Sequence, residues 1–272
     1  MLHRKIGEVG ANKEAPVLQE RDPNLVGGLM KGLRIIEAFD TDHARLAIAD
    51  VSRTTSMDRA TCRRLLLTLV SLGFAEHDGK FFKLTPRILR LGYAYLQSAS
   101  LPSIVQPLLE QLSRETEESC SVSVLDGQSI VYIARAARRR VMSINLSVGS
   151  RLPAYCSSMG RVLLAALPPP VAKAILEQSD RRVLTPKTLT EVSVLMTELA
   201  TIRSENCAII DEELELGLRS IAVPLYDSRG TIVAAMNIGA QAARVSVAQM
   251  RDIFYPKLAS AQADLRRLLA PE

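Results

Sequence analysis

The sequence of 272 residues predicts an α+β protein, with a small N-terminal winged helix-turn-helix domain and a larger C-terminal domain. Three observations carry this prediction. Three short amphipathic helix patterns follow one another after residue 28, and an Asp-Gly turn between two short apolar segments comes directly after them. Beyond Pro102, hairpin-linked strand patterns alternate with helix patterns, which favours an antiparallel sheet flanked by helices.

The composition indicates a globular chain without membrane spans. It is 47% hydrophobic and 23% charged, which suffices for packed cores, and no apolar run approaches the roughly 18 residues of a spanning helix. Residues 1–24 mix charge, Gly and Pro without periodicity or the apolar segment of a secretory signal. We therefore expect a mobile tail over 1–24, a cytoplasmic location and no membrane partner.

The first two helix patterns begin the small domain. The first has apolar residues at three- and four-residue steps, at Leu29, Leu33, Ile36 and Phe39. The second covers IADVSRTT, with Ile48 and Val51 facing inward. A third helix begins after Asp58, whose carboxylate can accept from first-turn amides, and stops at Gly73. A tight turn between the last two helices makes them a helix-turn-helix.

The third helix divides into an apolar and a cationic face. Its inward positions are Cys62, Leu65, Leu66 and Leu69, and its outward positions are Arg59, Arg63, Arg64 and Thr68. Arginine pairs are common on solvated helices, but the turn before this helix and the hairpin after it favour a recognition helix for double-stranded DNA.

The segment after the third helix predicts a wing. Asp78-Gly79 separates Phe74 from Phe81, Phe82 and Leu84, which is a hairpin signal, and Lys80 and Lys83 could reach the DNA backbone or minor groove. Residues 25–99 hold 11 basic and 7 acidic residues, which suits a polyanion partner. We expect the winged domain over 25–85, a linker helix opened by Pro86 over 86–101, and an effector-binding domain over 102–272.

The C-terminal domain begins with a helix pattern at PSIVQPLLEQLSRETEES. Strand patterns follow at CSVSVLD, SIVYIARA and VMSINL, then a helix at SSMGRVLLAALP and further helices to about Arg203. Strands near RSIAVPLYD and TIVAAMNIGA precede a final helix from about Val247.

These motifs resemble the IclR family of bacterial regulators over roughly residues 25 to 270. The resemblance rests on the segment from GLRIIEAF to LTPRILRLG and, in order, on DGQSIVYIARA, VGSRLPAYCSSMGRVLLAAL and DEELELGLRSIAVPLYD. RLPAYCSSMGRVLLA with ELELGLRSIAVP is most similar to the branch that controls protocatechuate, 4-hydroxybenzoate and β-ketoadipate catabolism. The resemblance implies a GAF-like effector domain, a homodimer or homotetramer, no cofactor, and operator DNA, a small organic acid and RNA polymerase as candidate partners.

The sequence departs from the family pattern at three places. Ala47 replaces the usual Ser or Thr cap, Ser56 replaces the usual glycine of the inter-helix turn, and Asn206-Cys207 replaces Gly plus an aromatic residue. The loss of the cap costs on the order of 1 kcal/mol, whereas Asn206 still tolerates a left-handed backbone.

The helix start at Ser157-Ser158 is the candidate sensing site. Ordinary capping is the alternative interpretation, but a helix start also suits a ligand carboxylate, and the family's effector cavity corresponds to this region. The implied lining residues are Val141, Ile144, Leu146, Tyr155, Ser157, Ser158, Met159, Leu218, Ser220 and Asn237. Tyr155 could contact a ring or belong to the core. With neutral donors at Ser158, Ser220 and Asn237, we expect an aromatic acid or β-ketoadipate to be held without a buried cation.

The leading alternative function is an enzyme with a helical oligomerisation domain and Cys156 or Cys207 as nucleophile. All three histidines, His3, His43 and His77, precede residue 100, and the cysteines are scattered without metal-ligand spacing, which disfavours catalysis and metal binding. We expect Glu212, Glu213 and Glu215 to form a solvated helical turn with a surface ion pair to Arg219, and Arg138–Arg140 to form a solvated hairpin tip. A sequence-neutral architectural protein would leave the C-terminal domain without a role.

Overall fold

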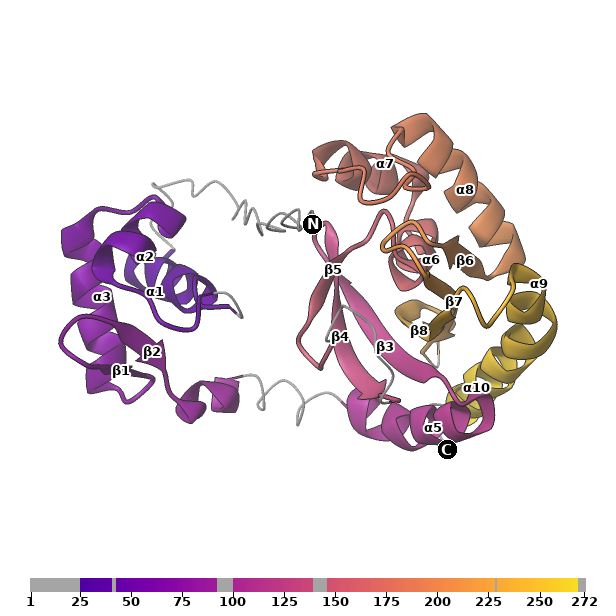
Figure 1. Cartoon of the computed structure of the whole chain (residues 1–272), viewed down its shortest axis with the longest axis horizontal. Coiled ribbons are helices and arrows are strands. Elements are labelled where there is room, and N and C mark those ends of the chain that lie inside the picture. Colours follow the sequence, from indigo (N-terminus) through magenta and orange to yellow (C-terminus); the bar gives the residue numbers. More distant parts are fainter. Residues whose placement is uncertain (1–24, 41–42, 92–99, 139–145, 228, 269–272) are drawn as a thin grey trace, which may run out of the picture. The chain divides into compact units, whose positions relative to one another are not determined.

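A computed structural model describes residues 25–40, 43–91, 100–138, 146–227 and 229–268. The chain divides into two compact units, Met1–Tyr95 and Leu96–Glu272, and each is described by itself (Figure 1). No helix within the described ranges is long and apolar enough to cross a membrane.

The N-terminal unit is a winged helix-turn-helix, as the sequence predicts. Its elements are α1 (Gly27–Glu37), α2 (Ile48–Thr55), α3 (Arg59–Ser71), β1 (Ala75–His77), β2 (Phe82–Leu84) and the 3-10 helix η1 (Pro86–Ile88). The antiparallel hairpin of β1 and β2 gains one more bridge, between Leu46 and Phe82. Ile35, Val51, Leu66 and Phe82 lie in the core, each with at most 1% of its surface exposed.

The turn between α2 and α3 has a left-handed residue at Ser56 and a helix cap at Asp58. Ser56 has a φ of 56°, in the left-handed region, which explains the usual glycine at this position. Asp58 then caps α3, because its carboxylate accepts from the Thr61 amide at 2.8 Å. The predicted start of the third helix, after Asp58, is confirmed.

The first helix buries a different face from the one that its apolar pattern predicts. Ile35 is fully buried, whereas 63% of Leu29 and 48% of Leu33 are exposed. The three- and four-residue steps identify the helix correctly, but Ile35 and Ala38 fill the core while the leucines form part of an apolar outer face.

Replacing Ala47 with serine is expected to stabilise the small domain by about 1 kcal/mol. Ala47 is the N-cap of α2 and offers no side-chain acceptor, although the Asp50 carboxylate already accepts from the Ala47 amide at 3.1 Å. A serine would supply the other half of a capping box. Thermal unfolding of the full chain tests this, with Ala60→Ser on the exposed side of α3 as the control that should not stabilise. An unchanged midpoint for Ala47→Ser would contradict it.

The C-terminal unit is a six-stranded antiparallel sheet flanked by helices. Its strands are β3 (Ser119–Asp126), β4 (Ser129–Ala136), β5 (Arg151–Pro153), β6 (Ala208–Asp211), β7 (Leu218–Tyr226) and β8 (Ile232–Gln241), in the order β5-β4-β3-β8-β7-β6. Its helices are α5 (Ser100–Thr116), α6 (Ser158–Ala166), α7 (Pro169–Gln178), α8 (Val192–Glu205), α9 (Val247–Gln249), the π-helix η2 (Met250–Phe254) and α10 (Tyr255–Leu268).

Two helical layers cover the two faces of this sheet. α5 and α10 pack on one face, α6 packs on the other, and α8 lies against α6 (Figure 1). Along β8, Met236 and Ile238 belong to the α5–α10 core, whereas Ala235 belongs to the α6 core. Strand alternation therefore turns Asn237 and Gly239 toward α6.

Most predicted strands and helices of this unit are confirmed where the structure describes them. The edge strands β5 and β6 were not predicted, because segments of three and four residues carry too little periodicity. The predicted strand VMSINL lies outside the described residues except for Leu146. Of the predicted linker helix over 86–101, the structure describes η1, helical residues 89–91, and residues 100 and 101. The last two belong to α5, so the helix that was predicted to begin at Pro102 begins at Ser100.

Candidate functional site

The outer face of α3 presents its predicted cations to solvent. Arg59, Arg63 and Arg64 are exposed, and Cys62, Leu66 and Leu69 are buried on the opposite side. None of the three arginines has an acidic partner among the residues that the structure describes. Thr68 is also exposed, and its hydroxyl donates to the Arg64 carbonyl at 2.8 Å. The helix therefore offers unpaired guanidinium groups of the kind that bind guanine edges and phosphates.

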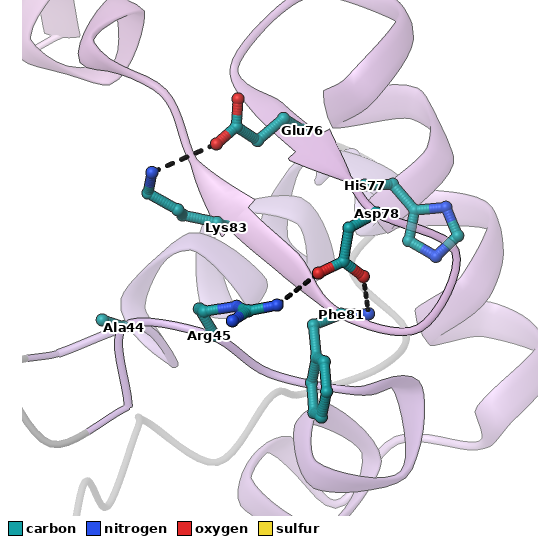
Figure 2. Close-up of a pocket in the computed structure, with 7 residues that line it drawn as sticks. All are labelled: Ala44, Arg45, Glu76, His77, Asp78, Phe81 and Lys83. Carbon is teal, nitrogen blue, oxygen red and sulfur yellow. Dashed lines mark hydrogen bonds and ion pairs between the residues drawn. The ribbon is translucent and has the colours of Figure 1, made fainter.

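The hairpin carries a shallow hollow of about 520 Å³ in which most charges are paired (Figure 2). Figure 2 shows Lys83 directed at Glu76, 3.1 Å away, and Arg45 directed at Asp78. The Asp78 carboxylate accepts from the amides of Lys80 and Phe81, and these bonds lower its pKa to about 2. Asp78 thus closes the predicted turn.

The two lysines of the wing differ in whether their ammonium groups have an acidic partner. Lys80 is exposed, with its ammonium 5.0 Å from the Phe81 ring centroid and no acidic partner in the described part of the chain. Lys83 shares its charge with Glu76. Lys80 is therefore the stronger candidate for a backbone contact with DNA.

The start of α6 is joined to the sheet by serine hydroxyls. Ser158 is 2% exposed and accepts from the Ser220 hydroxyl of β7 at 2.9 Å. Ser157 occupies the N-cap position, but its hydroxyl donates to the Pro153 carbonyl and caps no amide. Ordinary capping therefore does not explain this Ser-Ser pair. Gly160 keeps the helix close, because an added Cβ would lie 2.3 Å from the Ala154 carbonyl oxygen.

The other residues predicted to line the effector site differ in how deeply they are buried. Met159 is buried and accepts from the Ser123 hydroxyl at 3.2 Å. Tyr155 is core, with its hydroxyl donating to the Arg182 carbonyl at 2.7 Å. Leu146 and Leu218 are half-buried, and Val141 and Ile144 lie outside the described residues.

A cation that the sequence reasoning missed lies on the same sheet face. Arg135 of β4 is half-buried, and its Nη1 donates to the Ser121 hydroxyl of β3 at 2.8 Å. Ser121 pairs with Arg135 on one side and with Asn237 on the other. Within IARA the arginine looks like an ordinary solvated strand residue, so only the strand pairing identifies it. Burial lowers the pKa of this guanidinium, which still remains charged.

Three buried side-chain atoms of the described residues lack a hydrogen-bond partner: Arg135 Nε, Asn237 Oδ1 and Glu215 Oε2. Asn237 is 9% exposed. Buried polar groups are normally paired, so such atoms mark places where a ligand could bind. Burial also raises the pKa of Glu215, in the loop before β7.

The acidic loop before β7 differs from its predicted form. Residues 212–215 form bends and no helix, and Glu213 is 7% exposed. Its carboxylate binds both terminal nitrogens of Arg161, which is 1% exposed, and Arg219 pairs with Asp211 instead. The expected surface ion pair is therefore wrong for Glu213, because the loop folds inward over α6.

The cysteines lack the properties of nucleophiles. Cys62, Cys120, Cys156 and Cys207 are all buried and free. Burial raises the pKa of Cys156 to about 12 and of Cys207 to about 11, whereas a reactive cysteine needs a lowered pKa.

The structure describes only the first residue of the arginine run Arg138–Arg140. Arg138 is exposed, and its guanidinium donates to the Ser113 carbonyl; Arg139 and Arg140 lie outside the described residues.

Comparisons with known proteins agree in both units. The IclR helix-turn-helix domain matches residues 28–79, and the C-terminal domain of bacterial IclR transcriptional regulators matches residues 93–267. The Pca regulon regulatory protein of Pseudomonas putida is 41% identical over 90% of this chain and 84% of its own length.

Two solved structures extend the likeness. An IclR-family transcriptional regulator from Brucella abortus is 26% identical, with a TM-score of 0.79 over 94% of this chain and 97% of that one. The inducer-binding domain of an Acinetobacter PobR double mutant, in complex with 3-hydroxybenzoic acid, is 33% identical. It has a TM-score of 0.59 and covers 62% of this chain and 99% of its own. The winged helix-turn-helix, the flanked antiparallel sheet and these matches place the chain in the IclR family of bacterial transcriptional regulators.

Proposed function

We propose that this protein is a ligand-responsive, cytoplasmic regulator of genes for aromatic-acid or β-ketoadipate catabolism, and not an enzyme. The observation that carries the proposal is the outer face of α3, where Arg59, Arg63 and Arg64 stand without acidic partners in the described residues. On a winged helix-turn-helix this face enters the major groove. The regulator from Pseudomonas putida and the PobR domain support the pathway.

The DNA contacts divide between base reading and positioning. Arg59 and Arg63 are the proposed base readers, because they lie in the first two turns of α3. Arg64, Thr68, Lys80 and Lys83 are the proposed contacts to phosphate or minor groove. Residues 25–85 would form the DNA-binding domain, 86–101 the linker helix, and 102–272 the effector-binding domain.

The protein would bind its operator as a dimer, with the tetramer as a second state. Four apolar residues in α1 and directly before it have about half or more of their surface exposed: Leu25, Val26, Leu29 and Leu33. A second copy would bury this face, and a dimer would present two recognition helices to half-sites one helical turn or a multiple apart. RNA polymerase is the further candidate partner.

The effector would lie between the start of α6 and the sheet. Ser157, Ser158 and Ser220 supply hydroxyls there, Asn237 supplies an amide, and Met159, Leu146 and Leu218 supply apolar surface, with Tyr155 behind them. Val141 and Ile144 are proposed for the remaining wall. These groups suit a small carboxylate.

Two titrations test the two halves of the proposal, binding of operator DNA and binding of the acid. Anisotropy of a labelled promoter fragment beside the gene should report tight binding, which a hydroxybenzoate or β-ketoadipate then alters. Calorimetry should show that Ser220→Ala weakens binding of that acid by about 0.5 to 1.5 kcal/mol, the value of one neutral hydrogen bond. Ser204→Ala on α8 serves as the control, since its exposed hydroxyl bonds only the Thr201 carbonyl. No promoter binding, or no binding by any of these acids, would contradict the proposal.

A further inference from the structure

The outer face of the wing carries an arginine that is not among the proposed DNA contacts. Leu46 and Phe82 exchange two backbone hydrogen bonds, of 3.0 and 2.8 Å, and both side chains are buried. Strand alternation therefore turns Arg45, which precedes Leu46, to the solvent side, where it is exposed. Because the bridge is antiparallel, Arg45 lies across from Lys83, which pairs with Glu76 on its other side (Figure 2).

Arg45 and Lys80 lie close to the same aromatic ring. The Arg45 guanidinium carbon is 5.1 Å and the Lys80 ammonium 5.0 Å from the Phe81 ring centroid. Both are cation–π distances. Lys80 is already a proposed contact to the DNA backbone, so Arg45 lies within reach of the same stretch of phosphates. A duplex carries one phosphate charge per about 1.7 Å of its axis, which is dense enough to offer each cation its own phosphate.

A carboxylate of the wing competes for Arg45. Asp78 accepts from the amides of Phe81 and Lys80 with Oδ1, and from Arg45 Nη2 with Oδ2. The two amide bonds hold the pKa of this carboxyl at about 2, so it stays ionised at neutral pH. The side chains of Arg45 and Asp78 are 59% and 48% exposed, and ion pairs as exposed as this one are weak. A phosphate can therefore replace the carboxylate on Arg45, while the amide bonds keep Asp78 in its turn.

We propose that Arg45 is a further contact to the DNA backbone, and that it exchanges its ion pair with Asp78 for one with a phosphate when the protein binds DNA. This inference rests on the proposed function and adds a residue to its DNA contacts. Asp78 then has two roles: Oδ1 closes the turn of the wing, whereas Oδ2 holds the guanidinium in the free protein and competes with DNA for it. The contact is independent of base sequence, because phosphates carry no base information.

Anisotropy titrations of the full chain with the promoter fragment and with a duplex of random sequence test the phosphate contact. At about 0.15 M salt, Arg45→Ala should weaken binding to both by about 3- to 10-fold. The slope of log affinity against log salt should become shallower by about 0.9, the value for one phosphate. Arg45→Lys keeps the charge and should keep the slope. Unchanged affinity for both duplexes in a folded Arg45→Ala protein, or a loss confined to the promoter fragment, would overturn the proposal.

Asp78→Asn tests the competition. Asparagine keeps an oxygen that accepts from the Lys80 and Phe81 amides, but its nitrogen cannot accept from Arg45. Both duplexes should bind about 1.5- to 5-fold more tightly, which corresponds to the loss of one exposed ion pair. Arg45→Ala should then cost more in the Asp78→Asn background than in the wild type, because the broken pair no longer offsets the phosphate contact. If Arg45 only masks the charge of Asp78, its removal costs less in that background, and this sign overturns the exchange.

Asp126→Asn and Arg151→Ala are the matched controls. They break an exposed Arg–Asp pair of 2.5 Å in the C-terminal unit and change the net charge of the chain by the same amounts. Neither should alter DNA affinity or the salt slope; if they act as their counterparts do, net charge explains the effects and the proposal is overturned. If Arg63→Ala weakens promoter binding and Arg45→Ala does not, this inference fails while the proposed regulator stands. If the wild type binds neither duplex, the DNA-binding half of the proposed function fails with it.

Discussion

Replacement of Arg63 by alanine is expected to weaken operator binding by about 1 to 3 kcal/mol, and the Arg59→Ala/Arg63→Ala protein should lose more than either single variant. Both guanidinium groups are exposed on α3 and lack acidic partners in the described residues, so their donors are free for guanine edges. The loss should concentrate at one base pair of each half-site, which competition with operators substituted at single positions would reveal.

Arg63→Lys is the matched control for this effect. Lysine keeps the charge but loses the bidentate geometry, so its salt dependence should stay close to that of the wild type while discrimination between base pairs falls. Unchanged operator affinity in both alanine variants, with circular dichroism like that of the wild type, would show that α3 does not read the operator.

Replacement of Glu213 by alanine is expected to destabilise the C-terminal unit by about 3 to 5 kcal/mol, because it leaves a buried charge without its partner. Arg161 is 1% exposed, and its Nη1 lies 2.8 Å from Glu213 Oε1, while its Nε donates to the Tyr155 carbonyl. Glu213 also accepts from the Leu189 amide at 3.1 Å. The pair therefore ties α6 to two loops, and urea unfolding followed by circular dichroism measures the loss.

Two further variants separate the buried charge from general damage. Arg161→Met/Glu213→Leu removes both charges and should recover much of the stability, since a buried pair can often be replaced by apolar residues. Glu177→Ala breaks an exposed pair with Lys173 and should cost at most about 0.5 kcal/mol. A loss below about 1 kcal/mol in Glu213→Ala would contradict the importance of the pair.

Local signals in the sequence predicted the small domain almost completely. Asp58 as a cap, the apolar stripe with Leu66 and the Asp78-Gly79 turn act within a few residues of one another, so the chain shows them without its tertiary partners. The sequence did not predict which side of α1 faces the core. Leu29 and Ile35 are both apolar, and only the packing of α2 and α3 against α1 decided that Ile35 is buried.

The sequence predicted which neighbouring strands form hairpins, but it did not predict the order of the strands in the sheet. β3–β4 and β7–β8 are joined by short turns, so neighbouring patterns identify them. The pairing of Ser121 with Asn237 brings together residues more than a hundred positions apart. No local periodicity contains that register, because it depends on which strands can bury their faces against the same helices.

The sequence by itself therefore determined the winged helix-turn-helix, the cationic face of α3 and the α+β class of the second domain, because helix periodicity, caps and turns act over short stretches of chain. Only the tertiary structure decided that Arg135 and Asn237 lie on either side of Ser121 in one cross-strand row, that an added Cβ on Gly239 would meet no neighbour within 4 Å, and that Glu213 is buried against Arg161. Each of these depends on segments far apart in the chain, and the burial and pairing of a polar residue are set by the neighbours that the fold brings to it.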